Sequence, residues 1–199
     1  MTNFNESATK TNLMRAFAGE SQARNRYTFA AEIAKKQELY VIEAVFNLTA
    51  NQELAHANVF MKHLSEFNGE NIEIDGTYPV EVTNSVVELL ENAHHNENEE
   101  YENVYKEFEN VAEREGHMAI ANSFKEIGAI ENEHANRFKL FADLLKQNKL
   151  FVNDVECEWM CLNCGHIYKG KSVPEACPVC YHKKGYFVRI ELAPYCKKK

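Results

Sequence analysis

Apolar residues recur at helical spacing through most of the chain, in stretches almost free of glycine and proline. Such spacing, with apolar positions three and four residues apart, predicts amphipathic helices. Helices of roughly 25 to 32 residues would be about 40 Å long at 1.5 Å per residue. We expect four of them: from about Lys10 to Gln37, from Tyr40 to Phe67, from a cap at Thr83 or Asn84 to Glu115, and from Met118 to about Gln147.

The segment between the second and third helices cannot continue a helix, because EIDGTYPVEVT contains Gly76 and Pro79. Its length suits a crossover that carries the chain from one end of a helix bundle to the other. The pattern therefore predicts a mainly α fold, a four-helix bundle with one long crossover.

The pattern changes after Asn148, where β-branched and aromatic residues replace the helical spacing and turn residues lie near two Cys-x-x-Cys pairs. We expect a linker near Asn148–Val155. The chain thus divides into a helical domain over residues 1–150 and a small β/loop module over residues 151–199.

The overall charge limits the classes of partner. A formal charge of -8, from 22 Lys and Arg against 30 Asp and Glu, disfavours nonspecific binding to nucleic acid or anionic lipid. No apolar run reaches transmembrane length, and the start of the chain lacks the order of a secretory signal. We expect a cytoplasmic protein.

The helical part contains an internal duplication. A shift of 78 residues places Phe46 on Phe124, Glu53 on Glu131 and His56 on His134, and a shift of 77 places Glu20 on Glu97. Each half therefore contributes one helix with a glutamate and one helix with Glu-x-x-His. Two such motifs in a matching context are much harder to obtain by chance than one.

The duplicated residues predict a di-metal site. Residues three apart share a helix face, so each Glu-x-x-His pair can bind a common centre, and neighbouring phenylalanines indicate that this face points inward. Buried carboxylates need protons or cations, although solvated faces of an acidic protein are the alternative. We expect Glu53 and Glu131 to bridge two metals, with Glu20 and His56 terminal on one and Glu97 and His134 on the other. Oxygen-rich mixed ligation favours iron, with manganese as an alternative.

Glu100 lies three residues after Glu97, whereas Ala23 occupies the matching place after Glu20. It is a seventh candidate ligand without a symmetry mate. We hypothesise that Glu100 competes with His56 for one metal according to oxidation state. The alternative is a surface glutamate beside Glu99.

The C-terminal module carries a strong metal signal. Two Cys-x-x-Cys pairs separated by 12 residues can close a tetrahedral thiolate site for zinc or a single iron. The four predicted ligands are Cys161, Cys164, Cys177 and Cys180. Cys157 and Cys196 have no matching pair and are interpreted as free thiols.

The strings AFAGESQARNRY, NQELAH, ENEEYENVY and AIENEH, together with the tetracysteine segment, resemble the rubrerythrin family over nearly the whole chain. The segment CxxCGHIYKG…CPVC is similar to rubredoxin. The resemblance implies a ferritin-like bundle with a rubredoxin-like iron module, in a homodimer from an anaerobe or microaerophile. Its di-iron ligands fall on Glu20, Glu53, His56, Glu97, Glu100, Glu131 and His134.

The activity implied by the resemblance is an NADH peroxidase-type reduction of hydrogen peroxide, supplied with electrons by a rubredoxin or an NADH-dependent flavoprotein reductase. Tyr27 and Tyr105 correspond to tyrosines that hydrogen-bond ligand carboxylates or bound peroxide, the alternative being plain core tyrosines. Two other functions remain as alternatives: a ferroxidase for iron handling, and a zinc-loaded interaction module without turnover. Zinc is also an alternative occupant of the iron sites.

Overall fold

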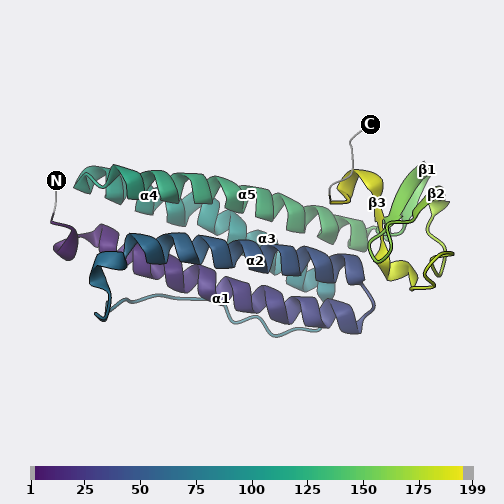
Figure 1. The fold of residues 1–199 in the computed structure, drawn as a ribbon, viewed down its shortest axis with the longest axis horizontal. Helices are drawn as coiled ribbons and strands as arrows, with labels where there is room; N and C mark the ends of the chain where they lie inside the picture. Colours follow the sequence, from purple (N-terminus) through teal and green to yellow (C-terminus); the bar gives the residue numbers. More distant parts are fainter. Residues whose placement is uncertain (1–2, 195–199) are drawn as a thin grey trace.

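The computed structural model describes residues 3–194, which form a bundle of four long helical rods with a small β module at one end (Figure 1). Residues Glu100–Val104 are π-helical and join two α-helices into one continuous rod. The expected mainly α, ferritin-like bundle is confirmed. Its helices are α1 (Ala8–Lys36), α2 (Tyr40–His63), α3 (Val86–Glu99), α4 (Tyr105–Glu115) and α5 (Met118–Lys146).

Two helix ends differ from the prediction. The cap of α3 is Ser85, not Thr83 or Asn84, because the extended backbone of Ser85 places its hydroxyl 3.3 Å from the Glu88 amide. Thr83 instead accepts a hydrogen bond from the Ser85 amide. The second helix ends at His63 rather than Phe67, since the chain tightens there into a 3₁₀ turn over Ser65–Phe67.

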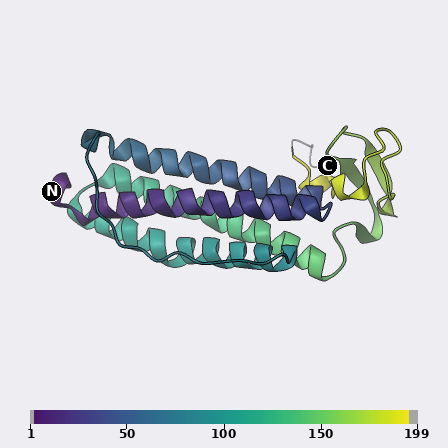
Figure 2. The ribbon, with the colours of Figure 1, turned by 90° about the horizontal axis from the view of Figure 1, so that it is seen from below.

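The segment from residue 68 to residue 84 is the long crossover, and it runs along the length of the bundle (Figure 2). It carries the chain from the C-terminal end of α2 to the N-terminal end of α3, at the end where the β module lies. The two halves of the bundle, α1–α2 and α3–α5, are therefore joined as the sequence predicts.

The bundle core consists of two apolar clusters, one on each side of a polar middle. The cluster toward the β module includes Tyr27, Phe46 and Phe138, and the other includes Phe60 and Phe124. Since each cluster draws on both halves of the chain, burial of these aromatic rings holds the halves together.

The C-terminal module is a three-stranded antiparallel sheet in the order β2-β1-β3, with β1 (Val152–Cys161), β2 (Ile167–Ser172) and β3 (Phe187–Arg189). Strand β1 begins at Val152, so the linker is shorter than predicted. The chain turns at Asn148, whose φ of 54° lies in the left-handed region.

The module packs against the turn between α1 and α2. The ring of Tyr40 stacks on that of Tyr186 with centroids 4.1 Å apart, and Lys183 forms an ion pair with Glu38. A Cβ atom on Gly185 would lie 1.8 Å from the carbonyl oxygen of Glu38, so glycine is required there. No helix within residues 3–194 is long and apolar enough to cross a lipid bilayer.

Candidate metal centres

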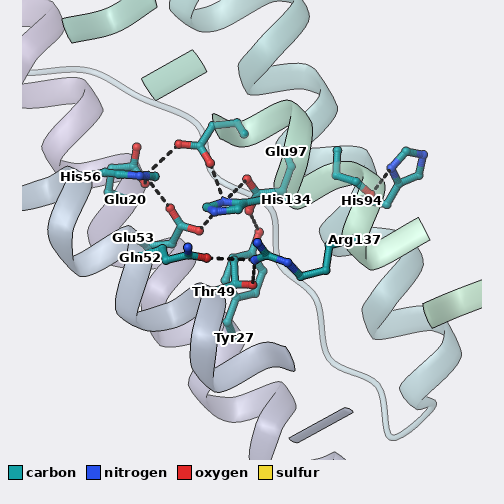
Figure 3. A network of polar contacts seen from close by, with 12 residues as sticks. Glu20, Tyr27, Thr49, Gln52, Glu53, His56, His94, Glu97, His134 and Arg137 are labelled. Atoms are coloured by element: carbon teal, nitrogen blue, oxygen red, sulfur yellow. Dashed lines mark hydrogen bonds and ion pairs between the residues drawn. The ribbon is translucent and has the colours of Figure 1, made fainter. Parts of the chain in front are cut away.

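Six acidic and histidine side chains from four helices converge in the middle of the bundle (Figure 3). Their potential ligand atoms form two groups, each within 4.8 Å: Glu20, Glu53, His56 and Glu131 in one, and Glu53, Glu97, Glu131 and His134 in the other. Glu53 and Glu131 belong to both groups. The sharing corresponds to the bridging roles that the duplication predicts for these two glutamates.

Each histidine directs one ring nitrogen at the carboxylates. His56 Nδ1 lies 3.1 Å from Glu53 Oε2 and 2.9 Å from Glu131 Oε1. His134 Nδ1 lies 3.0 Å from Glu53 Oε1 and 2.7 Å from Glu131 Oε2. The two rings are nearly parallel, with centroids 5.7 Å apart. The arrangement reproduces the pseudo-twofold relation between the halves.

The cluster fits a pair of metal ions. Buried atoms of Glu20, Glu53, Glu97, Glu131 and His134 have no hydrogen-bond partner, although oxygen and nitrogen atoms lie within ion-pair distance of one another. The lone pairs of these oxygen and nitrogen atoms point into the same space, where no hydrogen-bond donor meets them. Unpaired buried charge is costly, and two cations in that space would neutralise it. The donor set, carboxylates with two imidazoles, suits iron.

The close approach of these buried groups also shifts the pKa values of the cluster residues in metal-free protein. Burial first, and then the charges of Glu131 and Glu53, raises the pKa of Glu20 well above its ordinary value. Burial and the charge of Glu53 do the same for the pKa of Glu97. Burial lowers the pKa of His56, but the carboxylates of Glu131 and Glu53 beside its Nδ1 outweigh burial and raise it to about 9. The metal-free cluster therefore holds protons where a loaded cluster would hold cations.

Tyr27 and Tyr105 complete the symmetric part of the site. The hydroxyl of Tyr27 donates to Glu97 Oε1, and that of Tyr105 donates to Glu20 Oε1, so each tyrosine holds a carboxylate from the opposite half. The ring of Tyr27 contacts Phe46 and Phe138, whereas Tyr105 contacts the duplicated partners of those two phenylalanines. Because each hydroxyl fixes one oxygen, the other is left for a metal.

The π-helical segment explains why Glu100 has no symmetry mate. The halves are offset by 77 residues at Glu20 and Glu97 but by 78 at Tyr27 and Tyr105. The third rod therefore contains one extra residue between these points, where the structure has its π-helix. A π turn takes up one additional residue inside an α-helix. The insertion begins at Glu100.

Glu100 belongs to neither group of four but lies within electrostatic reach of both bridging carboxylates. Burial, followed by the charges of Glu131 and Glu53, raises its pKa to about 8. It also interacts with the charge of His56. The structure thus places Glu100 beside the cluster, within electrostatic reach of ligands in both groups.

Arg137 is a residue at the site that the sequence reasoning did not single out. One guanidinium nitrogen donates to Thr49 Oγ1 at 3.0 Å and to Gln52 Oε1 at 2.9 Å, which links α5 to α2 (Figure 3). Its charge interacts with Glu53 and Glu97. Its duplicated partner is Val59, and the difference between HANVF and HANRF was the available signal.

The tetracysteine site lies in the β module. The sulfur of Cys161 is 3.8 Å from that of Cys180, and the sulfur of Cys164 is 3.7 Å from that of Cys177. A tetrahedron with metal–sulfur bonds of about 2.3 Å has edges of about 3.8 Å, so the four sulfurs fit one ion. Cys161 and Cys177 are buried, Cys164 is exposed and Cys180 is partly exposed, so one edge of the site faces solvent.

Backbone amides support the thiolate form of these cysteines. The amide of His182 donates to Cys180 and helps to lower the pKa of that thiol to about 6. The amide of His166 also donates to Cys164, although burial and the neighbouring thiols of Cys180 and Cys177 leave the pKa of Cys164 raised. Hydrogen bonds to sulfur also tune the potential of a bound iron. Cys157 forms no disulfide within residues 3–194, and Cys196 lies outside the described residues.

Comparisons with known proteins agree with this architecture. The rubrerythrin family model matches residues 11–142, and the model of the rubrerythrin rubredoxin-like domain matches residues 159–188. Rubrerythrin-1 of Clostridium acetobutylicum is 42% identical over 181 residues, which cover 90% of this chain and 92% of the relative. Rubrerythrin of Nitratidesulfovibrio vulgaris is 36% identical, with 94% of this chain and 96% of the relative covered.

Solved structures show the same fold. Nigerythrin in a mixed-valent state has a TM-score of 0.62 and 27% identity, with 95% of this chain and 94% of nigerythrin covered. Symerythrin from Cyanophora paradoxa, at 24% identity and a TM-score of 0.61, shows the likeness of fold alone. One family model covers the residues of the helical cluster, and the other covers the four cysteines. This protein belongs to the rubrerythrin family of di-iron proteins.

Proposed function

We propose that this protein reduces hydrogen peroxide to water at the six-residue cluster, with electrons supplied through the tetracysteine site. The observation that carries the proposal is the pair of buried ligand groups sharing Glu53 and Glu131, in the same chain as a tetrathiolate site. Reduction of one peroxide takes up two electrons and two protons, breaks the O–O bond and yields two water molecules. The proposal makes the protein an NADH peroxidase-type oxidoreductase.

The residues of the cluster have different proposed roles according to their positions. The six residues of the cluster would hold two ferrous ions, which would supply the two electrons for cleavage of the O–O bond. Glu53 and Glu131 hold both metal positions at a fixed separation, while Tyr27 and Tyr105 keep Glu97 and Glu20 oriented by donating to one oxygen of each. The apolar clusters on both sides limit access of water.

Glu100 and His56 make the two positions inequivalent. We propose that Glu100 is a ligand in the oxidised protein and that His56 replaces it in the reduced protein, as the resemblance implies. The unmatched position of Glu100 in the π-helical segment supports this exchange. Structures in both oxidation states test it, because an unchanged ligand set would show the proposal to be wrong.

Electrons would enter the module at its solvent-facing edge, formed by Cys164 and Cys180. A rubredoxin or an NADH-dependent flavoprotein reductase is the proposed donor. An iron ion held by the four cysteines would supply one-electron chemistry, so two transfers through this site would be needed for each peroxide reduced.

The proposed setting is a homodimer in the cytoplasm of an anaerobe or microaerophile. Large apolar side chains on α2 support the dimer, because Leu48 is 51% exposed and Leu54 48% exposed in the single chain. Sedimentation velocity of the iron-loaded protein measures the oligomeric state. A monomer at micromolar concentration would contradict this part of the proposal.

The experiment that tests the activity is anaerobic addition of one equivalent of hydrogen peroxide to the fully reduced, iron-loaded protein, with both chromophores followed by stopped-flow absorbance. We expect rapid oxidation of the di-iron centre. Metal analysis beforehand separates iron from zinc at each site. If peroxide leaves both chromophores reduced, the proposed activity is wrong.

A variant at the tetracysteine site distinguishes the role of that site from the role of the six-residue cluster. Cys180→Ser, which removes one thiolate from the module, should leave the first oxidation by peroxide intact but stop re-reduction by the donor. Turnover that continues unchanged in Cys180→Ser would contradict the electron route. Oxidation and retention of added ferrous iron without any donor would favour the ferroxidase alternative.

A further inference from the structure

A cavity of about 250 Å³ lies beneath the crossover, between α1 and the rod formed by α3, the π-helical segment and α4. Its lining includes Glu100 and Tyr105, which link it to the metal cluster, and Asp75 to Pro79 of the crossover cover it. The cavity between α4 and α5 also reaches Tyr105, but its lining includes none of the seven predicted ligands. The covered cavity therefore reaches Glu100 and Tyr105, and the hydroxyl of Tyr105 donates to the cluster residue Glu20.

Two polar clamps hold the crossover over this cavity. At one end Arg15 forms an ion pair with Asp75. At the other, Glu81 accepts hydrogen bonds from Arg26 at 3.2 Å and from Asn96 at 2.7 Å, and the Arg26 and Glu81 side chains are only about 15% exposed. Both ends of the segment that covers the cavity therefore contact helices, and the Arg26–Glu81–Asn96 contact is the more buried of the two.

Gly19 forms part of the cavity wall, one residue before Glu20 in the interior of α1. Glycine destabilises the interior of a helix relative to alanine, so its presence calls for a reason. Packing does not supply one, since a Cβ atom added to Gly19 would meet nothing within 4 Å. The position therefore has room for a methyl group, whereas a longer side chain would extend into the cavity, one residue before a predicted metal ligand.

The lining suits a small, mixed polar and apolar molecule. Arg26 and Gln22 offer hydrogen-bond donors, while Ala16, Val104 and Phe108 provide apolar contact. The volume is several times that of one water molecule, so the cavity has room for a small organic molecule. A hydroperoxide with a short alkyl group has both characters, a polar O–O–H end and a compact apolar end.

We propose that this cavity is the route by which hydroperoxides reach the cluster, and that it admits short-chain alkyl hydroperoxides as well as hydrogen peroxide. The proposal rests on the proposed peroxide reductase activity for its substrates. Each alkyl hydroperoxide would take up two electrons from the reduced metal pair and two protons, break its O–O bond, and leave as one alcohol and one water. Gly19 acts here as a residue that determines access and size selectivity.

The test replaces Gly19 with a side chain that fills the cavity. Gly19→Leu extends into open space, and Gly19→Ala is its matched control because the added Cβ atom is accommodated. Val104→Phe, from the opposite wall, is a second filling variant in case the first does not fold. Metal content, thermal unfolding and the tetracysteine spectrum verify that each variant is folded and loaded.

Two measurements then report how fast small molecules reach the metal cluster. The first is the rate at which azide, a small anion that ligates ferric iron, changes the spectrum of the oxidised protein. The second is the rate at which hydrogen peroxide and tert-butyl hydroperoxide oxidise the reduced protein. We expect Gly19→Leu to slow azide and hydrogen peroxide about tenfold and tert-butyl hydroperoxide more, with Gly19→Ala within about twofold of wild type.

The two readouts distinguish the route from the activity. If azide binds a folded, loaded Gly19→Leu and Val104→Phe as fast as wild type, the route is wrong whatever peroxide does. If azide is slowed but peroxide never oxidises even the wild-type protein, the route is supported and the proposed activity is wrong. Equal slowing of the small and the alkyl hydroperoxide would overturn the size selectivity.

Discussion

The two halves of the helical bundle supply the same ligands but different surroundings. Each half provides one glutamate, one Glu-x-x-His pair and one tyrosine, and the halves exchange hydrogen bonds across the site. The second half alone contains the π-helical insertion with Glu100, and it alone carries a cation, Arg137, where the first half has Val59. A duplicated scaffold thus builds a symmetric metal cluster, and two local departures make its positions inequivalent.

The two departures carry opposite charges. Glu100 adds a carboxylate whose charge acts on both Glu20 and Glu97, and its proposed exchange with His56 would place that carboxylate on one of the two metal positions. Arg137 adds a positive charge that interacts with Glu53, which both groups share, and with Glu97, which only the group containing His134 includes. An anion near one metal favours its higher oxidation state, and a cation near the other favours its lower one. The comparison predicts an electrically polarised pair.

The largest effect is expected where the halves are equivalent. Glu131→Ala removes a residue shared by both ligand groups, so both metals of the cluster should be lost while the tetracysteine metal stays. Metal analysis and the visible spectrum measure this. Glu133→Ala, an exposed glutamate two residues along the same helix, is the matched control and should bind a full complement. Full loading of Glu131→Ala would mean that the two groups do not share this ligand.

The second prediction removes the insertion's side chain. Glu100→Ala should keep both metals, because six ligands remain, but slow oxidation by peroxide by about 10- to 100-fold if the proposed ligand exchange is correct. It should also make the two metals more alike in the Mössbauer spectrum of iron-loaded protein. If Glu100→Ala is oxidised by peroxide at the wild-type rate and still shows two distinct iron signals, the proposed ligand role of Glu100 is wrong.

Much of this comparison could be predicted from the sequence, because the ligands repeat. Glu53, His56 and their partners stand in matching strings, and burial of phenylalanines on the same face fixes their direction. The offsets of 77 and 78 residues were visible too, but only the backbone shows that the extra residue is taken up as a π turn. A sequence offset does not say whether a helix bulges, breaks or shifts register.

Other features depend on contacts that no local pattern encodes. Arg137 reaches Thr49 and Gln52 across the interface of α5 and α2, a pairing set by how those helices meet. The requirement for glycine at position 185 comes from the carbonyl of Glu38, more than a hundred residues away in the chain. The cap at Ser85 rather than Thr83 depends on where the crossover turns. Tertiary context decides each of these.

The third prediction concerns pH. In metal-free protein the pKa values of Glu20, Glu97 and His56 are raised, and that of Glu100 is raised to about 8. A raised pKa means that the folded state binds more protons than the unfolded state, so stability is present below the unfolded pKa and is lost as pH rises through the folded one. Metal-free protein should therefore lose stability from about pH 5 to about pH 9.

Loaded protein should respond in the opposite direction over the same range. Metals bind deprotonated ligands, so a rise from about pH 5 to neutrality strengthens metal binding and with it the folded state. Thermal unfolding midpoints of chelator-treated and iron-loaded protein, measured across this range, give both slopes. In metal-free Glu100→Gln the decline near pH 8 should be smaller, which isolates the contribution of the second half. Parallel slopes in the two forms would contradict the exchange of protons for metal.

The smallest effect is expected from Arg137→Val, which gives the second half the residue found in the first. Loss of the two hydrogen bonds to α2 should lower the free energy of unfolding by about 1–3 kcal/mol. Removal of the positive charge should also favour the ferric state, by roughly 1 kcal/mol at an effective dielectric constant of about 20, which lowers the midpoint potential by tens of millivolts. Redox titration of the iron-loaded protein measures this shift, and Arg137→Lys, which retains the charge, is the control. A midpoint potential that falls equally in both variants would assign the effect to packing. A fall confined to Arg137→Val would show that the two halves differ in the electric field at the metals as well as in their ligands.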